Sequence, residues 1–279
     1  MKLSLILAPY DSGYHNVGCG QGPEAIVSGG LVEELTLSGH DVAVEDIGKV
    51  GPEPGREIAT GFAVAAAVAE KTAEAIKAGR FPIVLAGNCL TTVGAVAGEA
   101  ADSIVWADQH GDLNTPDTSV SGFLDGMALA AVLGQCWPAM AGAVPGFAAI
   151  NASRCLLIDA RDLDAAEKDI VERLPLLHSQ CADAAESAGR LMANGAGRTH
   201  LHLDLDVLDP DVVQVNRYSW PGGPGPDGLC EAAGRLAQTL PVCGITLSAY
   251  DPAYDPQGEV PPVVGRLLID VLDVLEKKA

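Results

Sequence analysis

The stretch Asp108-Gln109-His110-Gly111-Asp112 directly follows an uncharged run, 103–107, that has the length and composition of a buried strand. A second acidic stretch, Asp204-Leu205-Asp206-Val207-Leu208-Asp209-Pro210, follows a similar run at 199–203. Side chains two positions apart on an extended strand point the same way. The first stretch can therefore bring Asp108, His110 and Asp112 together, and the second can bring Asp204 beside Asp206.

These two stretches together predict a divalent-metal site with one or two ions. Four carboxylates and an imidazole packed close together repel one another unless a cation lies among them. The alternative is that the aspartates only cap turns at strand ends. Five residues of these types in two matched stretches favour the metal site.

Strand-length apolar runs alternate with Ala-rich stretches of helical period along the whole chain, which predicts a single α/β domain over residues 1–279. Such alternation favours three layers, with a mostly parallel sheet of about eight strands and helices on both faces. Ligands of such sheets bind beyond the carboxyl ends of strands, where both acidic stretches fall. The expected strands are 3–8, 41–46, 82–86, 103–107, 154–158, 174–178, 199–203 and 242–247. The expected helices are 22–38, 56–79, 90–101, 164–173, 181–194, 227–239 and 262–277.

The composition limits the partners of the protein. An apolar fraction of 48% is ample for a core, and a formal net charge of −20 argues against nucleic acid and anionic membranes, which need a basic surface. Residues 126–153 carry no charge, but Pro138 and Pro145 interrupt them, so two short buried helices and a loop are expected. The seven cysteines form no regular framework, which favours reduced thiols in a cytoplasmic protein.

Three motifs in this order resemble the signatures of the arginase/agmatinase/formiminoglutamase family, the ureohydrolases. The family patterns are Gly-Gly-(Asn/Asp)-His, Asp-Ala-His-x-Asp and Ser-x-Asp-x-Asp-x-x-Asp-Pro. Here they read Gly87-Asn88-Cys89, Asp108-Gln109-His110-Gly111-Asp112, and His202-Leu203-Asp204-Leu205-Asp206-Val207-Leu208-Asp209-Pro210. The resemblance covers nearly the whole chain.

The resemblance implies a hydrolase that uses two Mn²⁺ ions. Asp108 and Asp204 would bridge the ions; His110 and Asp206 would complete one ion, and Asp112 and residue 89 the other. Oxygen-rich ligation suits Mn²⁺. A hydroxide between the ions would attack a guanidino, amidino or related carbon and break a linear C–N bond. Asp112 would orient that hydroxide and pass its proton to the leaving nitrogen.

Three positions depart from the family pattern. Cys89 stands where the family usually has histidine. A thiolate favours softer ions such as Zn²⁺ or Fe²⁺. The family includes a subgroup with cysteine at this position, and some of its members act on hydroxylated guanidines. The alternative is an inert buried thiol. Ala249 aligns with a substrate-facing glutamate, which argues against ordinary arginine as the substrate, although Asp251 or Asp255 could replace that acid. Asp125 aligns with a proton-shuttling histidine; it is not equivalent to histidine, and it is expected either to relay protons or to bind an amine.

The resemblance also suggests all but one of a set of substrate-binding residues. The exception is Arg217, which lies in a loop that departs from the family pattern and could receive an anionic substrate. Each has a simpler alternative: turn formation near Pro116, capping of a helix by Asp164, or a solvated arginine at 217. His202 alternates with Asp204 and is either a neighbour of the metal ligands or a packed strand histidine. The expected substrate-binding residues are Asn114, Ser119, Ser121, Asp164 and Arg217.

Two other functions stay open at this stage. The first is a deacetylase-like amide hydrolase, which shares the fold and keeps one ion, here at Asp108, His110 and Asp206. The second is a non-catalytic binding protein that holds metal. The expected partner is a small molecule, and the resemblance implies a homo-oligomer, either a trimer or a hexamer.

Overall fold

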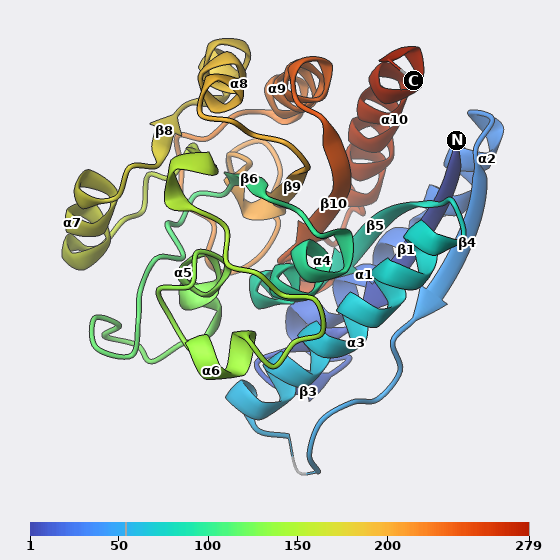
Figure 1. The fold of residues 1–279 in the computed structure, drawn as a ribbon. Helices are drawn as coiled ribbons and strands as arrows, with labels where there is room; N and C mark the ends of the chain where they lie inside the picture. Colours follow the sequence, from blue (N-terminus) through green and yellow to red (C-terminus); the bar gives the residue numbers. More distant parts are fainter. Residues whose placement is uncertain (54, 279) are drawn as a thin grey trace.

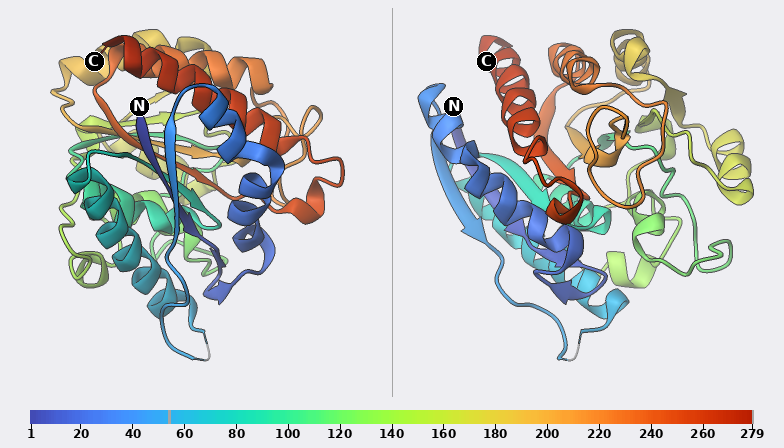
Figure 2. Two further views of the ribbon diagram at one scale, coloured as in Figure 1. Left: turned by 90° about the vertical axis from the view of Figure 1, so that its right-hand side faces the viewer. Right: turned by 180° about the vertical axis from the view of Figure 1, so that it is seen from behind.

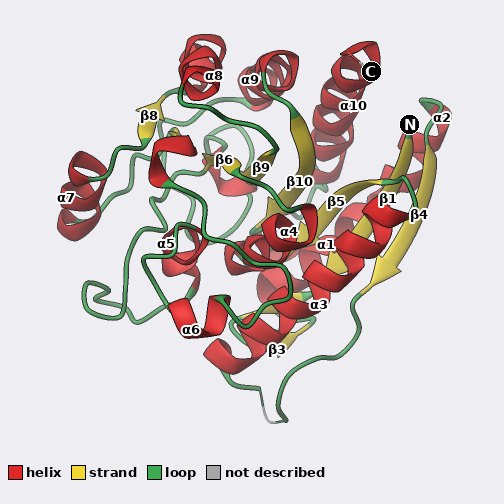
Figure 3. Ribbon diagram, viewed as in Figure 1, coloured by secondary structure: helices red, strands yellow, loops and turns green. Residues whose placement is uncertain are grey.

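The computed structural model describes residues 1–53 and 55–278 and has a parallel β-sheet at its centre (Figures 1 and 3). Eight strands lie in the order β4-β1-β5-β10-β9-β6-β7-β8, and every neighbouring pair is parallel. The prediction of a single α/β domain with a mostly parallel sheet of about eight strands is confirmed. The strands are β1 Lys2–Ala8, β4 Asp41–Asp46, β5 Phe81–Ala86, β6 Ser103–Ala107, β7 Cys155–Ile158, β8 Leu177–Ser179, β9 Thr199–Asp204 and β10 Val242–Ser248.

Helices cover both faces of this sheet, as the views in Figure 2 show. Their buried residues divide into separate hydrophobic clusters on the two sides. One face carries α3 Glu57–Lys77, α4 Thr92–Glu99, α5 Ala128–Val132, α6 Pro138–Ala141 and α7 Ala165–Arg173. The other carries α1 Gly22–Ile26, α2 Val32–Leu37, α8 Ala184–Ala193, α9 Pro226–Thr239 and α10 Val260–Lys278.

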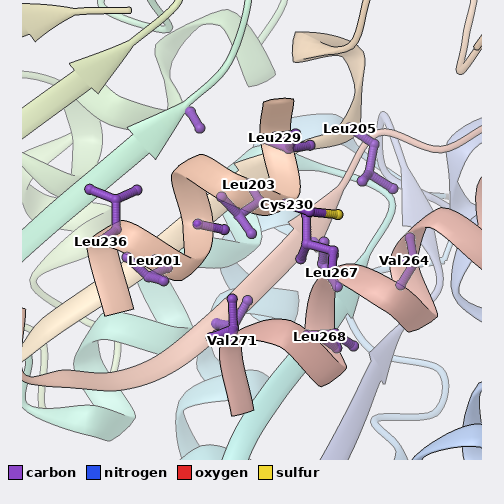
Figure 4. Packing of buried hydrophobic residues seen from close by; sticks show 14 of the residues in the cluster. Leu201, Leu203, Leu205, Leu229, Cys230, Leu236, Val264, Leu267, Leu268 and Val271 are labelled. Carbon is purple, nitrogen blue, oxygen red and sulfur yellow. The ribbon is translucent and has the colours of Figure 1, made fainter. Parts of the chain in front are cut away.

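The strands divide their side chains between these clusters by simple alternation. In β9, Leu201 and Leu203 point into the cluster under α9 and α10, where Figure 4 shows them near Leu236 and Leu267. The intervening residues His200 and His202 face the opposite side and are fully buried there. Each fully buried leucine contributes roughly 1.5–3 kcal/mol to stability. A strand held on both faces gives its carboxyl end a fixed position.

The predicted helix over 22–38 is wrong as a single element. The chain forms α1, then a π-helical turn Val27–Leu31, then α2, because Gly30 has a φ of 104° and breaks the helix. A Cβ at Gly29 would lie 2.5 Å from the Cβ of Pro261, so the absence of side chains here lets α10 pack closely.

Smaller differences occur elsewhere. The strand expected at 174–178 starts at Leu177 instead, since Pro175 has no N–H for a sheet. A short hairpin of β2 Tyr10–Asp11 and β3 Tyr14–His15 was not predicted.

The uncharged segment 126–153 forms α5, α6 and loops, which confirms the two short helices. All of α5 is buried as expected, but only Ala141 of α6 is, so the prediction of burial is wrong for α6. Within the described residues, none of the helices is long and apolar enough to cross a membrane. All seven cysteines are free thiols.

Candidate metal centre

Four adjacent strands end at one place in the sheet and bring the acidic motifs together. These strands are β5, β10, β9 and β6. Cys89 follows β5, Asp108 follows β6, and Asp204 is the last residue of β9. Because the strands are parallel, their carboxyl ends share an edge, and residues far apart in sequence converge there.

The first group of potential ligands consists of Asp108, His110 and Asp206, called here the His110 side. Their donor atoms all lie within 4.8 Å of one another. The Nδ1 atom of His110 is 3.3 Å from Asp108 Oδ1 and 3.6 Å from Asp206 Oδ2. The His110 side chain is 30% exposed, so this side opens toward solvent.

The second group consists of Cys89, Asp108, His202 and Asp204, called here the Cys89 side. Its donor atoms also lie within 4.8 Å of one another, and all four residues are buried. The thiol of Cys89 donates to Asp204 Oδ2 at 2.8 Å, and Ser248 Oγ lies 3.3 Å from the same sulfur. Asp108 belongs to both groups, so the two sides are contiguous.

The electrostatics of this cluster call for a cation. Burial, and then the neighbouring carboxylates, raise the pKa of Asp112 and Asp204 well above the usual range, and burial also raises the pKa of Asp206. Burial opposes ionisation of Asp108 as well, but the hydrogen bond and charge of His110 outweigh it and lower the pKa of Asp108. Burial would lower the pKa of His110, yet Asp206 and Asp108 raise it to about 10.

Two carboxylate oxygens in the cluster have no hydrogen-bond partner. These are Asp112 Oδ2 and Asp206 Oδ1, both buried. An unpaired buried carboxylate oxygen is costly unless a proton or an ion neutralises it. The donor set therefore fits divalent ions.

Asp112 has a strained backbone, with a φ of 50° that non-glycine residues rarely adopt. Its carbonyl accepts a hydrogen bond from Ala130 N at 2.9 Å, which helps to hold this conformation. Asp112 lines the pocket but belongs to neither of the two donor groups found among the described residues. Its role as a metal ligand stays a prediction.

Hydrogen bonds from side chains behind the cluster orient the potential ligands. The indole Nε1 of Trp106 donates to Asp108 Oδ2 at 3.0 Å. The amide of Asn216 donates to Asp206 Oδ2 at 3.2 Å and to the carbonyl of Ala249 at 2.8 Å. Outer contacts of this kind fix ligand orientation in metal sites. Sequence reasoning missed the role of Asn216, because 216 and 206 meet only through a folded loop.

The ligand cluster forms the floor of a cavity of about 190 Å³. Besides Cys89 and the five predicted aspartate and histidine ligands, the predicted residues Asn114, Ser119, Ser121 and Asp125 line it. Ala249 lines it too, whereas Asp251 and Asp255, offered above as replacements for the missing glutamate, do not. Asp251 accepts from Ala253 N, and Asp255 accepts from Tyr250 and the start of α10. The suggestion that either acid takes the place of that glutamate in the pocket is therefore wrong.

Asp125 holds the turn that carries Cys89. Its Oδ2 accepts from Asn88 Nδ2 at 2.9 Å and from Cys89 N at 3.0 Å, and its Oδ1 accepts from Leu90 N at 2.8 Å. Burial raises the pKa of Asp125 to about 6 despite these three bonds. The geometry thus gives Asp125 a positioning contact with the Cys89 turn, and its proton-relay role stays a prediction.

The remaining predicted substrate residues differ in position. Asp164 does not line the cavity; it forms a capping box with Glu167 at the start of α7 and accepts from Asn114 Nδ2 at 2.9 Å. Ser119 and Ser121 accept from the backbone of Gly122 and Phe123. Arg217 is exposed, outside the cavity lining, and stacks over Tyr218. The helix-capping role of Asp164 and the turn-forming role of the two serines are therefore confirmed. Substrate contacts of these residues stay predictions.

Some residues of the cavity wall were not anticipated. Glu167 is buried and accepts from Leu113 N at 3.2 Å, and burial raises its pKa. Its position three residues after Asp164 signals a capping box, but not that the box reaches the cavity. The other unanticipated lining residues include Asp11, Phe123 and Tyr218.

The chain is similar in sequence and in fold to known proteins. The model of the Arginase family matches residues 1–272. Arginase of Bacillus caldovelox is 32% identical over 232 residues, covering 75% of this chain and 77% of that protein. Arginase of Bacillus subtilis (strain 168) is 29% identical, covering 98% and 97%. The crystal structure of arginase from Bacillus cereus superposes with a TM-score of 0.87 at 28% identity, covering 97% and 98%.

Proposed function

Because this chain belongs to the arginase family and is a hydrolase of non-peptide C–N bonds, we propose that it cleaves a guanidino C–N bond at a pair of divalent ions. The observation that carries the proposal is the contiguity of the His110 side and the Cys89 side through Asp108. The proposed ligands are Cys89, Asp108, His110, Asp112, Asp204 and Asp206.

Bound ions would supply a water of lowered pKa and would stabilise negative charge that develops on the substrate. The chain itself supplies proton handling. Asp112 lines the cavity that the substrate would enter, and its Oδ2 is buried and has no hydrogen-bond partner. It can take a proton from the attacking water and deliver it to the leaving nitrogen, which a guanidine needs because an amide anion is a poor leaving group.

The two sides favour different metals. The His110 side offers two carboxylates and one imidazole, a set that suits Mn²⁺. The Cys89 side adds a sulfur atom, which suits Zn²⁺ or Fe²⁺ better. Two Mn²⁺ ions, or one Mn²⁺ beside a softer ion, are the proposed cofactors.

L-Arginine is the first substrate to test, since relatives named arginase are 29–32% identical and give no support for excluding it. One observation favours a less cationic guanidine. Ala249 stands in the cavity wall where the family pattern has a carboxylate, and alanine cannot pair with a guanidinium. We therefore propose that an N-hydroxylated or otherwise less basic guanidine is turned over faster than arginine.

The test is product release from Mn²⁺-loaded protein: urea from L-arginine and agmatine, hydroxyurea from N-hydroxy-L-arginine, and formamide from N-formimino-glutamate, which is an amidine. Turnover of a guanidine is expected, with kcat/KM higher for the hydroxylated compound than for arginine. Equal or higher kcat/KM for arginine would remove the argument from Ala249 and leave the C–N hydrolase in place. No turnover of any guanidine by protein holding two ions would contradict the proposal.

A one-ion amide hydrolase would use only Asp108, His110 and Asp206. The second donor group around Cys89 favours two ions, because a single site has no use for it. Assembly into a trimer or hexamer and a cytoplasmic location are further parts of the proposal; light scattering at working concentration checks the first, and fractionation of the source cells the second.

A further inference from the structure

His202 is the only member of the two donor groups, within the part of the chain that the structure describes, that the family resemblance does not supply. The third family motif has serine at this position and the first has histidine at position 89. In this chain the first motif has cysteine and the third has histidine. The imidazole that is missing from one wall of the site is therefore present on another.

The two positions face each other in space. His202 lies on β9 two residues before Asp204, on the same face of the strand. One atom of its ring lies within 4.8 Å of donor atoms of Cys89, Asp108 and Asp204. Ser248 Oγ bridges the two, 3.3 Å from Cys89 Sγ and 3.5 Å from His202 Nε2.

The orientation of the ring is fixed by two contacts. Nδ1 lies 2.8 Å from Thr92 Oγ1, and the ring stacks on Trp106 with centroids 3.5 Å apart and planes 18° apart. When Nδ1 carries the proton and donates to Thr92, the lone pair of Nε2 faces the Cys89 side. A hydrogen bond from the other ring nitrogen is what metal-bound histidines ordinarily show.

We propose that His202 Nε2 is a metal ligand, so that the ion on the Cys89 side is held by Cys89 Sγ, His202 Nε2 and carboxylate oxygens of Asp108 and Asp204. One sulfur, one imidazole nitrogen and two carboxylates form the donor set of a four-coordinate Zn²⁺ site. On this ion His202 takes the place that the resemblance gives to Asp112, and Asp112 keeps its proton-handling role. A short thiol at 89 leaves space that the imidazole from β9 occupies. The centre then binds two different metals, Zn²⁺ on the Cys89 side and Mn²⁺ on the His110 side. This inference rests on the proposed two-ion site.

The test is zinc K-edge X-ray absorption on full-length protein with one equivalent of Zn²⁺, together with Zn²⁺ affinity from chelator competition. Wild type is expected to show one Zn–S distance of about 2.3 Å and imidazole scattering from the same ion. His202→Ser, which restores the serine of the family motif, is expected to lose that combination and to bind Zn²⁺ at least about 100-fold more weakly.

His200→Gln is the matched control. His200 lies on the same strand and the same face and is fully buried, but it contacts Glu99 and Thr246 instead of the cluster. It should keep the sulfur, the imidazole and the wild-type affinity. If His202→Ser does not fold, judged by circular dichroism, Thr92→Val removes only the Nδ1 partner and should weaken Zn²⁺ binding by about 10–100-fold.

Sulfur with imidazole and unchanged affinity in His202→Ser would overturn the inference, as would a wild-type spectrum without sulfur. In the Thr92→Val arm, unchanged affinity would also overturn it. The proposed function fails separately. If wild-type protein shows sulfur and imidazole bound to zinc but hydrolyses no guanidine, the zinc site stands and the proposed C–N hydrolase is wrong. If it hydrolyses a guanidine but His202→Ser leaves the zinc spectrum and affinity unchanged, the hydrolase stands and the zinc ligand is wrong.

Discussion

The two halves of the candidate metal centre, the His110 side and the Cys89 side, share Asp108 but differ in exposure and in donor atoms. The His110 side has a partly exposed imidazole and opens toward the cavity. The Cys89 side is buried and contains a thiol and an imidazole that stacks on Trp106. Solvent access and hard oxygen ligands suit exchange of substrate and product, whereas a buried sulfur and nitrogen set suits a permanently held ion. The comparison suggests one ion that is retained and one that exchanges.

The largest effect is expected from Asp108→Asn, because Asp108 belongs to both halves. Loss of a shared carboxylate should remove both ions and lower the hydrolysis rate by about 10³-fold or more, since each ion supplies several kcal/mol of transition-state stabilisation. Metal content by plasma mass spectrometry and urea release measure the two parts.

Asp102→Asn is the control for that substitution. Asp102 precedes the same strand at its opposite end, is partly exposed and accepts from Gly197 N. It should retain both ions and full activity. Two bound ions in Asp108→Asn would refute the shared role.

The next substitutions separate the halves. Asp206→Asn should release the ion of the His110 side only, and Cys89→Ser should release a soft ion from the Cys89 side only, so each variant should hold one ion per chain. Metal content after dialysis against a weak chelator measures this. Loss of both ions in either variant would mean that the halves bind cooperatively and are not independent.

Asn216→Ala tests the outer contacts of the His110 side. The amide of Asn216 joins Asp206 to the carbonyl of Ala249, a residue with a φ of 64°. Its removal should weaken Mn²⁺ binding by about 10–100-fold and leave Zn²⁺ binding on the Cys89 side unchanged. Isothermal titration with each metal checks the difference, and equal weakening of both would contradict it.

The pH dependence of stability sharpens the electrostatic argument. Without metal, Asp112, Asp204 and Asp206 have a pKa above the ordinary value of 3.8, so the folded chain binds more protons than the unfolded one above about pH 4. The metal-free protein should therefore lose stability as pH rises, and ions should replace the lost protons. The rise in Tm on adding Mn²⁺ should be larger at about pH 8 than at about pH 5. The opposite order would contradict the account.

The smallest effect is expected at Arg217, which is exposed and outside the cavity wall. Arg217→Ala should leave kcat unchanged and raise KM by a few-fold at most, and only for substrates with a carboxylate, since exposed ion pairs contribute about 0–1 kcal/mol. Steady-state kinetics on arginine and on agmatine, which lacks the carboxylate, measure the difference. A large fall in kcat would contradict this placement.

Much of the fold could be predicted from the sequence because buried parallel strands are near-continuous apolar runs. Asp108 and Asp204 could be placed at one edge of the sheet because both follow such runs. The break at Gly30 could not be predicted, because glycine adopts helical and positive φ values about equally well. The close approach of α10 to Gly29 could not be predicted either. Helical period alone does not show that contact.

The candidate site divides in the same way. Ligands of one motif do lie close together, but the predicted alternation along a strand is not the reason. β6 ends at Ala107, before Asp108, and Asp206 lies in the 3-10 turn Leu205–Val207 after β9. Contacts between distant segments, such as Asn216 with Asp206 or Thr92 with His202, depend on loop paths and helix packing. Asp164 shows a further limit of sequence-based prediction. It caps α7 in the structure, but an aspartate would also be expected at a substrate contact, so the residue type alone does not distinguish the two roles.

The central claim is a two-ion C–N hydrolase with unequal halves, and the most direct test is hydrolysis measured against bound metal. Protein stripped of metal would receive Mn²⁺ in steps, in one series alone and in another after one equivalent of Zn²⁺, with total bound equivalents determined by equilibrium dialysis and turnover of the best guanidine recorded at each step. Activity should rise steeply only as the second equivalent binds. Full activity with one ion, or none with two, would contradict the central claim.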